Sequence, residues 1–498
     1  MSRPEGQASK LGSISLELIA YRHFDTRLGG LINFLGLPSR SALVARKIIW
    51  TIAISLSLLL VRPGLAQSPT GQFSPPVDPA ATLPEAGSAG NQWLLQESAA
   101  PPATAPPDSQ PSATDSDWAP GVFSNSRLQL SGNISIVGIA GTDRAFVPWN
   151  PLFMLPASPF GLSTNTLEIH GRQSSLQAIF QGPQVGEYQT GALFKVYLLA
   201  NSLTSDTYGL LPVVAFGEIK NDRWRFSGGL QPDLFAPRDP FVIPNVLLGG
   251  SGNPGTFRGQ LRAERTFWND DTSALKLQFA LSDPLTTILI DSSRRTTESN
   301  GWPNVEARLP WSIGPEVDLA GGRTERVAEL AVAGVVGQIR TTRLVFDLED
   351  LEDPTNVRNV IDVWGLSVDG KWNIGPRWGV AGEFFTGQAI GNYAANIFQS
   401  FNPDTFQPVR GSGGWGELFF YLSDRLHVHS GYGIESPQRA ALPIASGIAR
   451  NETWYTNWVW DMNKTVQLSF EVDYRQTDFV SLQSGSGALF ISQFLWRF

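Results

Sequence analysis

The chain has 498 residues, of which 42% are hydrophobic and only 16% are charged, below the roughly 25% of typical soluble proteins. It contains no cysteine, which excludes disulfides and thiolate metal sites, and its formal net charge of −8 argues against a nucleic-acid partner. The 49 glycines, 29 phenylalanines and 16 tryptophans fit short strands, tight turns and aromatic interfaces in an envelope protein.

Residues 1–66 are predicted to be an N-terminal extension followed by a secretory signal peptide. Arg46 and Lys47 precede an apolar run over residues 48–61, and small residues for cleavage follow. A transmembrane anchor is the alternative, but the run is shorter than the roughly 20 residues needed to span a bilayer, and Arg62 closes it. The run lies far from the first residue, which indicates a later translation start or an extended n-region.

Residues 67–121 are rich in proline, alanine and serine, and hold too few large apolar groups to offset the entropy of ordering. We expect this segment to be a disordered periplasmic spacer. Without residues 1–66 the chain holds 29 basic and 42 acidic residues, a formal net charge of −13.

Residues 122–498 are predicted to form an all-β transmembrane antiparallel up-and-down barrel. In residues 466–475 every even position is apolar or aromatic and every odd one polar, so one face is apolar and the other polar. Residues 224–230, 275–282 and 416–422 repeat this alternation. A soluble sandwich could show one such strand, but a lipid-facing band around a wet lumen explains the repetition better.

Short and long connections alternate strictly along this region, which predicts about sixteen strands with both ends on the periplasmic side. The short turns fall at residues 182–189, 220–223, 268–272, 313–323, 373–377, 423–425 and 462–464. The long loops lie near residues 144–164, 202–208, 236–255, 284–302, 344–358, 389–412, 437–448 and 478–486.

Aromatic residues mark the membrane interfaces and the C-terminus. Trp454, Trp458 and Trp460 share one face, as do Trp364 and Trp372, which is typical of aromatic girdles. The chain ends on a strand that resembles the assembly signal which outer-membrane proteins present to the barrel insertion machinery. An ordinary edge strand is the alternative. The residues of this expected signal are Phe494, Trp496 and Phe498.

The segment Glu218-Ile219-Lys220-Asn221-Asp222-Arg223-Trp224-Arg225, followed by Gly229 and Phe235-Ala236-Pro237, resembles the DcaP-like trimeric porins. The match is short, whereas a general porin resemblance covers residues 127–498. The resemblance implies that residues 236–255 fold into the barrel as a constriction loop and that three copies assemble, although a barrel of this size can also be a monomer.

Because side chains alternate between the two faces of a strand, the sequence predicts which charged residues point into the pore. They lie on the strands before and after the third long loop, on that loop, and on a later strand. Their charges favour anionic or dipolar solutes if they set a transverse field, and merely stiffen the wall if they pair across it; both readings stay open. The expected pore-lining residues are Arg225, Asp233, Arg238, Asp239, Arg258, Arg262, Glu264, Glu306 and Arg308.

The third loop also carries an apolar set that either packs against the wall or forms a greasy slide for a substrate; packing is the favoured reading. Glu471, Asp473 and Arg475 point inward by the same alternation. The apolar set consists of Val242, Ile243, Val246, Leu247 and Leu248.

Together these features predict an integral outer-membrane porin for passive diffusion of small polar solutes, in contact with outer-membrane lipid. A structural or adhesin barrel with a closed lumen is the alternative. The local serine and histidine pairs that a hydrolase could use are His170 with Ser174 or Ser175, and His427 or His429 with Ser430. A hydrolase is disfavoured because Ser430 has opposite strand parity to His427 and His429 and no nucleophile elbow occurs in the barrel. No enzyme activity, cofactor or metal is expected, apart from the alternative that His427 and His429, which share a face, bind an adventitious metal.

Overall fold

The computed structural model describes residues 127–156, 165–199, 208–243, 247–284, 302–345, 355–444 and 446–498. The expected signal peptide, the expected spacer and Val246 lie outside the described residues, so those assignments stay predictions. Among the described residues, no helix is both long enough and apolar enough to cross a membrane.

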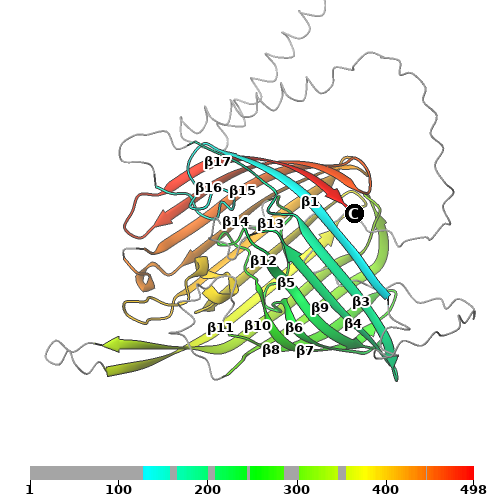
Figure 1. Ribbon diagram of the computed structural model, residues 1–498, viewed down its shortest axis with the longest axis horizontal. Coiled ribbons are helices and arrows are strands. Elements are labelled where there is room, and N and C mark those ends of the chain that lie inside the picture. Colours follow the sequence, from blue (N-terminus) through cyan, green and yellow to red (C-terminus); the bar gives the residue numbers. More distant parts are fainter. Residues whose placement is uncertain are drawn as a thin grey trace, which may run out of the picture. The chain divides into compact units, whose positions relative to one another are not determined.

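The strands form one antiparallel sheet that closes on itself (Figure 1). β1 (Arg127–Gly141) pairs with β17 (Gly485–Arg497) along one edge. Along its other edge β1 pairs with both β2 (Thr166–His170) and β3 (Ser175–Val185), each over part of its length. These two strands therefore occupy one position, and the barrel has the sixteen positions that the alternation of turns and loops predicted.

The remaining strands pair with their neighbours in sequence order around the barrel. They are β4 (Tyr188–Tyr197), β5 (Leu211–Lys220), β6 (Trp224–Pro232), β7 (Phe257–Asn269), β8 (Ser273–Ser282), β9 (Asn304–Leu319), β10 (Arg323–Val345), β11 (Thr355–Asn373), β12 (Trp378–Gln388), β13 (Arg410–Tyr421), β14 (Leu426–Pro437), β15 (Ile448–Asp461) and β16 (Val466–Phe479).

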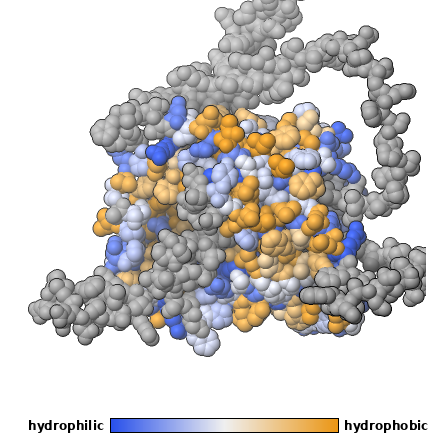
Figure 2. Space-filling model, in the orientation of Figure 1, coloured by the Kyte–Doolittle hydropathy of each residue, from blue (hydrophilic) through white to orange (hydrophobic). Residues whose placement is uncertain are grey.

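Alternation along each strand separates an apolar outside from a polar inside. In β16 the odd residues from Gln467 to Thr477 face inward and are buried, whereas Leu468, Phe470 and Tyr474 face outward and are 36–44% exposed. Successive side chains of a strand point to opposite faces, so this pattern fixes which residues reach the lumen. Figure 2 shows the outward apolar side chains gathered over the wall of the barrel.

Tryptophans on the outward face lie on β6 to β17, and none lies on β1 to β5. Trp364 and Trp372 face outward at a spacing of eight residues on β11, and Trp454 and Trp460 face outward on β15, as the girdle prediction required. Interfacial tryptophan is typical of lipid contact, so the wall from β1 to β5 has a different outer surface from the rest.

The strand boundaries confirm the order and places of the short turns and long loops, but the predicted turns at 182–189 and 313–323 are too wide, because β3 continues to Val185 and β9 to Leu319. The short strand β2 was not predicted. The short connections have two to four residues. Asp270 and Asn463 shape two of them by accepting hydrogen bonds from the backbone two and three residues ahead, which is how these side chains stabilise tight turns. Eight longer connections, numbered L1 to L8 in chain order, join the strand ends that lie away from these turns.

The C-terminal residue extends the pairing of β1 with β17 that closes the barrel. Gly132 N donates to Phe498 O at 2.9 Å, and Phe498 N donates to Gly132 O at 3.0 Å. A Cβ atom on Gly132 would lie 2.8 Å from the Phe498 ring and 2.6 Å from Ser175 O, so only glycine fits this contact. Phe494, Trp496 and Phe498 are 40–57% exposed and belong to the outward face, as predicted.

Two long loops fold into the barrel. L3 (residues 233–256) and L6 (residues 389–409), which contains η2 (Gly391–Tyr393) and η3 (Asn396–Phe398), bury apolar side chains against the wall. One cluster joins Phe235 of L3 and Tyr393 of L6 to residues of β10, β11 and β12. A third short helix, η4 (Arg439–Ala441), lies in L7.

Candidate functional site: the L3 constriction

L3 lies against β9, β13, β14 and β16, where four wall glutamates accept hydrogen bonds from its backbone. A buried amide needs an acceptor and a buried carboxylate needs donors, so each satisfies the other and the path of L3 is fixed. The bonds run from Leu234 N to Glu306 Oε2 (2.7 Å), from Phe241 N to Glu417 Oε2 (2.8 Å), from Ile243 N to Glu471 Oε2 (2.9 Å) and from Gly252 N to Glu435 Oε1 (3.1 Å).

The described apolar residues of L3 pack against inward-facing apolar residues of the wall. Val242 and Leu248 are fully buried in a cluster with Trp415 and Tyr455. Ile243 is buried in a second cluster that β1 and β17 complete. These contacts agree with the packing alternative for L3 rather than with an exposed greasy slide.

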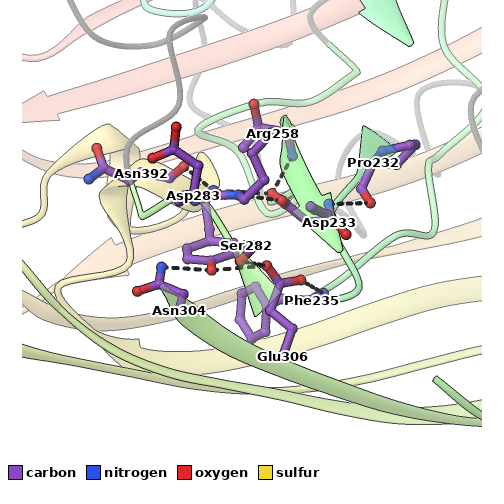
Figure 3. Close-up of polar contacts among 12 residues, drawn as sticks. Pro232, Asp233, Phe235, Arg258, Ser282, Asp283, Asn304, Glu306 and Asn392 are labelled. Carbon is purple, nitrogen blue, oxygen red and sulfur yellow. Dashed lines mark hydrogen bonds and ion pairs between the residues drawn. The ribbon is translucent and has the colours of Figure 1, made fainter. Parts of the chain in front are cut away.

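A buried ion pair anchors the start of L3 (Figure 3). The guanidinium of Arg258, on β7, pairs with Asp233 and has no exposed surface. It also donates to Asp283 O in L4 at 2.8 Å and to Asn392 O in L6 at 2.7 Å, and it lies 3.8 Å from the ring centroid of Tyr393. Arg258 therefore ties three loops together, and its charge is enclosed by protein.

Glu306 completes the same node from β9. One of its oxygens accepts from the backbone of L3, and the other accepts from the hydroxyls of Ser282 and Tyr393. Asn304 donates to the Tyr393 hydroxyl at 2.9 Å, so L6 is bound to the same wall strand. Figure 3 shows this chain of contacts below Arg258.

A second charged group lies further along L3. Arg238 donates to Asp369 of β11 at 2.8 Å and to Glu329 of β10 at 2.9 Å. Arg308 of β9 forms two bonds to the same Asp369, at 2.7 and 2.9 Å. One carboxylate therefore holds two guanidiniums, one from the loop and one from the wall.

The next loop residue, Asp239, is a titratable group on L3. Burial raises the pKa of its carboxyl to about 6, and this rise is opposed by a 3.0 Å hydrogen bond from Asn253 and by the Arg238 guanidinium. The charge of L3 therefore changes near neutral pH.

A third group of charged residues, the charge ladder, lies on the inner face of β5 to β8 and consists of Glu218, Lys220, Arg225, Arg262, Glu264 and Lys276. None of these four strands accepts a hydrogen bond from the L3 backbone through one of the four wall glutamates. Four cations surround two carboxylates along it, so its formal charge is +2. Its contacts are Lys220 to Glu218 (2.8 Å), Arg225 to Glu218 (2.6 Å), Arg225 to Glu264 (2.6 Å), Arg262 to Glu264 (3.7 Å) and Lys276 to Glu264 (3.7 Å).

The structure brings the nine expected pore residues into these separate groups rather than into one cluster. Asp233, Arg258 and Glu306 anchor L3; Arg238 and Arg308 share Asp369; Arg225, Arg262 and Glu264 belong to the ladder. Eight of the nine residues thus make ion pairs or hydrogen bonds to the wall or the loops, and Asp239 bonds to Asn253 within L3.

Sequence reasoning missed several partners of these residues. Strand parity alone would have placed Glu218, Lys276 and Asp369 on the inward face. Tyr393 carried no such signal, because it lies in an irregular loop whose path is set by distant contacts.

The histidines and serines considered for catalysis do not form a nucleophile and base pair. Ser430 faces outward and bonds to Thr456, whereas His427 and His429 face inward. Ser174 bonds to the backbone of Ser135 rather than to His170. Within the described part of the chain, no group of three His, Asp or Glu side chains is arranged to hold a metal ion.

Comparison with solved structures gives the fold. The outer membrane channel DcaP of Acinetobacter baumannii matches with a TM-score of 0.55 and 16% identity over 76% of this chain and 98% of that one. An anion-selective porin from Comamonas acidovorans matches at TM-score 0.49 and 9% identity, covering 75% and 100% of the two chains. OmpF of Salmonella typhi matches at 0.43 and 12%, covering 76% and 100%. These structure neighbours are outer-membrane porins. No family model and no curated protein matches the chain.

Proposed function

We propose that the chain forms a water-filled outer-membrane channel for passive diffusion of small polar solutes, with a preference for anions, and that three copies assemble. The barrel fold is shared with an outer membrane channel, DcaP. A diffusion pore performs no bond chemistry, so its function depends on the width of the constriction and on the side chains that replace part of a solute's hydration there.

The charge ladder on β5 to β8 is the observation that carries the anion preference. The backbone of L3 is bound to wall glutamates on β9, β13, β14 and β16, which leaves the inner face of β5 to β8 as the wall that we expect solutes to pass. Lys220 and Lys276 are 36% and 25% exposed, whereas Glu218 and Glu264 are 12% and 2% exposed. Because the lysines are more exposed than the glutamates, a solute meets more positive charge than the formal charge of +2 suggests. This excess of exposed positive charge favours anions.

The outer surface of β1 to β5 supports assembly into an oligomer. This part of the wall has no tryptophan, and apart from Phe194 its most exposed outward residues are aliphatic, such as Leu130, Ile136, Leu167 and Ile169, which are 50–71% exposed. A mainly aliphatic face that lacks the interfacial tryptophans of the other strands suits contact with protein rather than with the lipid interface.

Planar-bilayer recording with a salt gradient tests this function. We expect stable conductance steps, grouped in threes, and a reversal potential that indicates anion preference. Replacing both exposed lysines (Lys220→Gln with Lys276→Gln) lowers that preference: Coulomb's law gives about 0.4 kcal/mol per unit charge at about 10 Å in water, so two charges change ion partition about fourfold.

The matched control is Arg265→Gln. Arg265 lies on β7 near Arg262 but faces outward, so its removal leaves the charge of the lumen unchanged. No conductance from a correctly folded barrel would contradict the channel proposal. An unchanged reversal potential in the double lysine variant would contradict the role of the ladder in selectivity.

A further inference from the structure

Two histidines inside the barrel form a continuous polar chain between two acidic residues. His427 Nδ1 and His429 Nε2 lie 3.0 Å apart on β14. His429 Nδ1 lies 2.9 Å from Glu417 Oε1 on β13, and His427 Nε2 lies 3.4 Å from Asp461 Oδ2 on β15. The four residues form a relay whose histidine side chains are almost completely buried.

The relay is in direct contact with L3 through Phe241. The Phe241 ring stacks on His429 with a centroid distance of 4.0 Å and meets His427 edge-on at 5.4 Å. The backbone of Phe241 is bound on the same wall: its N–H donates to Glu417 Oε2 at 2.8 Å, and Asn457 donates to its carbonyl at 2.7 Å. A shift of the histidine rings therefore acts on this part of L3.

Hydrogen-bond counting allows only one N–H in the contact between His427 Nδ1 and His429 Nε2, so at most one of the two rings carries a positive charge. If His427 carries both ring protons, its Nδ1 donates to His429 and its Nε2 lies 3.4 Å from the Asp461 carboxylate as an ion pair, while a neutral His429 donates to Glu417. If both histidines are protonated, Nδ1 of His427 and Nε2 of His429 are both donors at 3.0 Å. That contact then becomes repulsive, and the two cations also repel each other.

Charged groups around the relay have opposing effects on the binding of a second proton to the histidine pair. Glu417 and Asp461 favour it, whereas nearby cations oppose it. Tyr421 stacks on His427 at 4.8 Å, and Tyr455 donates to Glu417 at 2.6 Å, so both enclose the relay. The charged and titratable residues facing the relay from neighbouring strands are Arg323 and Glu325 on β10, Lys371 on β11, Glu417 and Tyr421 on β13, Tyr455 and Asp461 on β15, and Arg497 on β17.

We propose that His427 and His429 position Phe241, and that a second proton on the pair releases this part of L3 from the wall and narrows the channel. The proposal rests on the proposed channel function, because its effect is on the passage of solutes. His429 and His427 are positioning residues: they touch L3 and need not touch the solute. The channel is then widest near neutral pH and conducts less in acid.

The test is conductance of the full chain from about pH 8 to about pH 4, which brackets the ordinary pKa of histidine. We expect the wild-type conductance to fall severalfold in acid. The variant His427→Gln with His429→Gln has no such fall, because glutamine keeps polar groups but cannot titrate. His170→Gln is the control, since His170 is buried elsewhere, beside Trp149, and its loss leaves the acid fall intact.

A second measurement follows L3 itself and does not depend on conductance. The chain has no cysteine, so Pro240→Cys, next to Phe241 and buried, gives one thiol without background. We expect its labelling in acid to exceed its labelling near neutral pH, after division by the labelling of the same cysteine in the glutamine double variant. If the double variant does not fold, Phe241→Leu replaces it, and we expect a smaller fall because the ring stack is lost.

The outcomes separate this proposal from the channel proposal. Channels that conduct at neutral pH with a flat pH profile would overturn the relay and leave the channel function standing. An acid fall that persists in the double glutamine variant would also overturn the relay. A folded barrel that conducts at no pH would overturn the channel function, and equal normalised labelling of Pro240→Cys at both pH values would then overturn the relay independently.

Discussion

Individual wall carboxylates fix the position of L3 by accepting several hydrogen bonds each. Glu306 accepts two bonds from the L3 backbone and two from the hydroxyls of Ser282 and Tyr393, which fills its capacity as a carboxylate. Leaving such donors unpaired costs about 1–3 kcal/mol for each group. Glu306, which strand parity places in the lumen, therefore acts here as an anchor for a loop rather than as a contact for solute.

The raised pKa of the Asp239 carboxyl leads us to predict that the ion selectivity of the channel depends on pH. Its pKa of about 6 leaves the carboxyl neutral in acid and charged above that pH, so L3 gains one negative charge as pH rises. Because the folded-state pKa is raised, ionisation opposes folding, and this contribution to stability is full below about pH 4 and is lost as pH rises to about 6. We expect anion preference to fall about twofold between about pH 5 and about pH 7, as expected for one charge at about 10 Å in water.

The measurement is the reversal potential in the background of His427→Gln and His429→Gln, which removes the histidine relay. In that background Asp239→Asn is expected to keep the acid-side selectivity at every pH. A pH-dependent reversal potential that survives Asp239→Asn would place the titrating group elsewhere.

At the scale of elements, glycines determine how closely L3 approaches the wall. Gly252 has a φ of +106°, and a Cβ there would lie 2.1 Å from Gly414 O on β13. On the wall side, a Cβ on Gly433 of β14 would lie 2.0 Å from Ser251 O. Both the loop and the wall thus need a residue without a side chain where they meet. Asn451 secures the contact by donating to Gly250 O at 3.0 Å and to the Ser251 hydroxyl at 2.7 Å.

Gly433→Ala is expected to push the L3 segment at residues 250–252, the tip of L3, away from the wall and into the channel. The physical reason is the 2.0 Å approach to a backbone oxygen, which cannot move without the loop. We expect lower single-channel conductance, by about a third or more, from a barrel that still folds. Gly416→Ala is the matched control, because Gly416 on the adjacent β13 faces outward and has no atom within 4 Å of an added Cβ. Equal conductance of the two variants would show that the L3 tip does not depend on this contact.

At the scale of the whole molecule, the sequence predicted the barrel better than it predicted the constriction. Strand parity follows from local chain geometry, so the inward direction of Glu471 and the outward direction of Trp454 could be assigned without knowing any partner. The pairing of Arg238 with Asp369 joins residues 131 positions apart and depends on the path of an irregular loop. The same limit applies to the relay: parity placed His427 and His429 on one face, but not against Phe241.

Two variants at Phe498 can distinguish its backbone role in closing the barrel from the expected role of its ring in the assembly signal. Phe498→Ala keeps the two backbone bonds to Gly132, so we expect near wild-type refolding in detergent but poor insertion in cells if the aromatic residue is read by the insertion machinery. Deletion of Phe498 also removes both bonds, so refolding in detergent is expected to fall as well, since each net hydrogen bond contributes about 1 kcal/mol. Heat-modifiable migration in gels measures both outcomes. Normal insertion of Phe498→Ala in cells would mean that the terminal ring is a structural residue of β17 and not a signal.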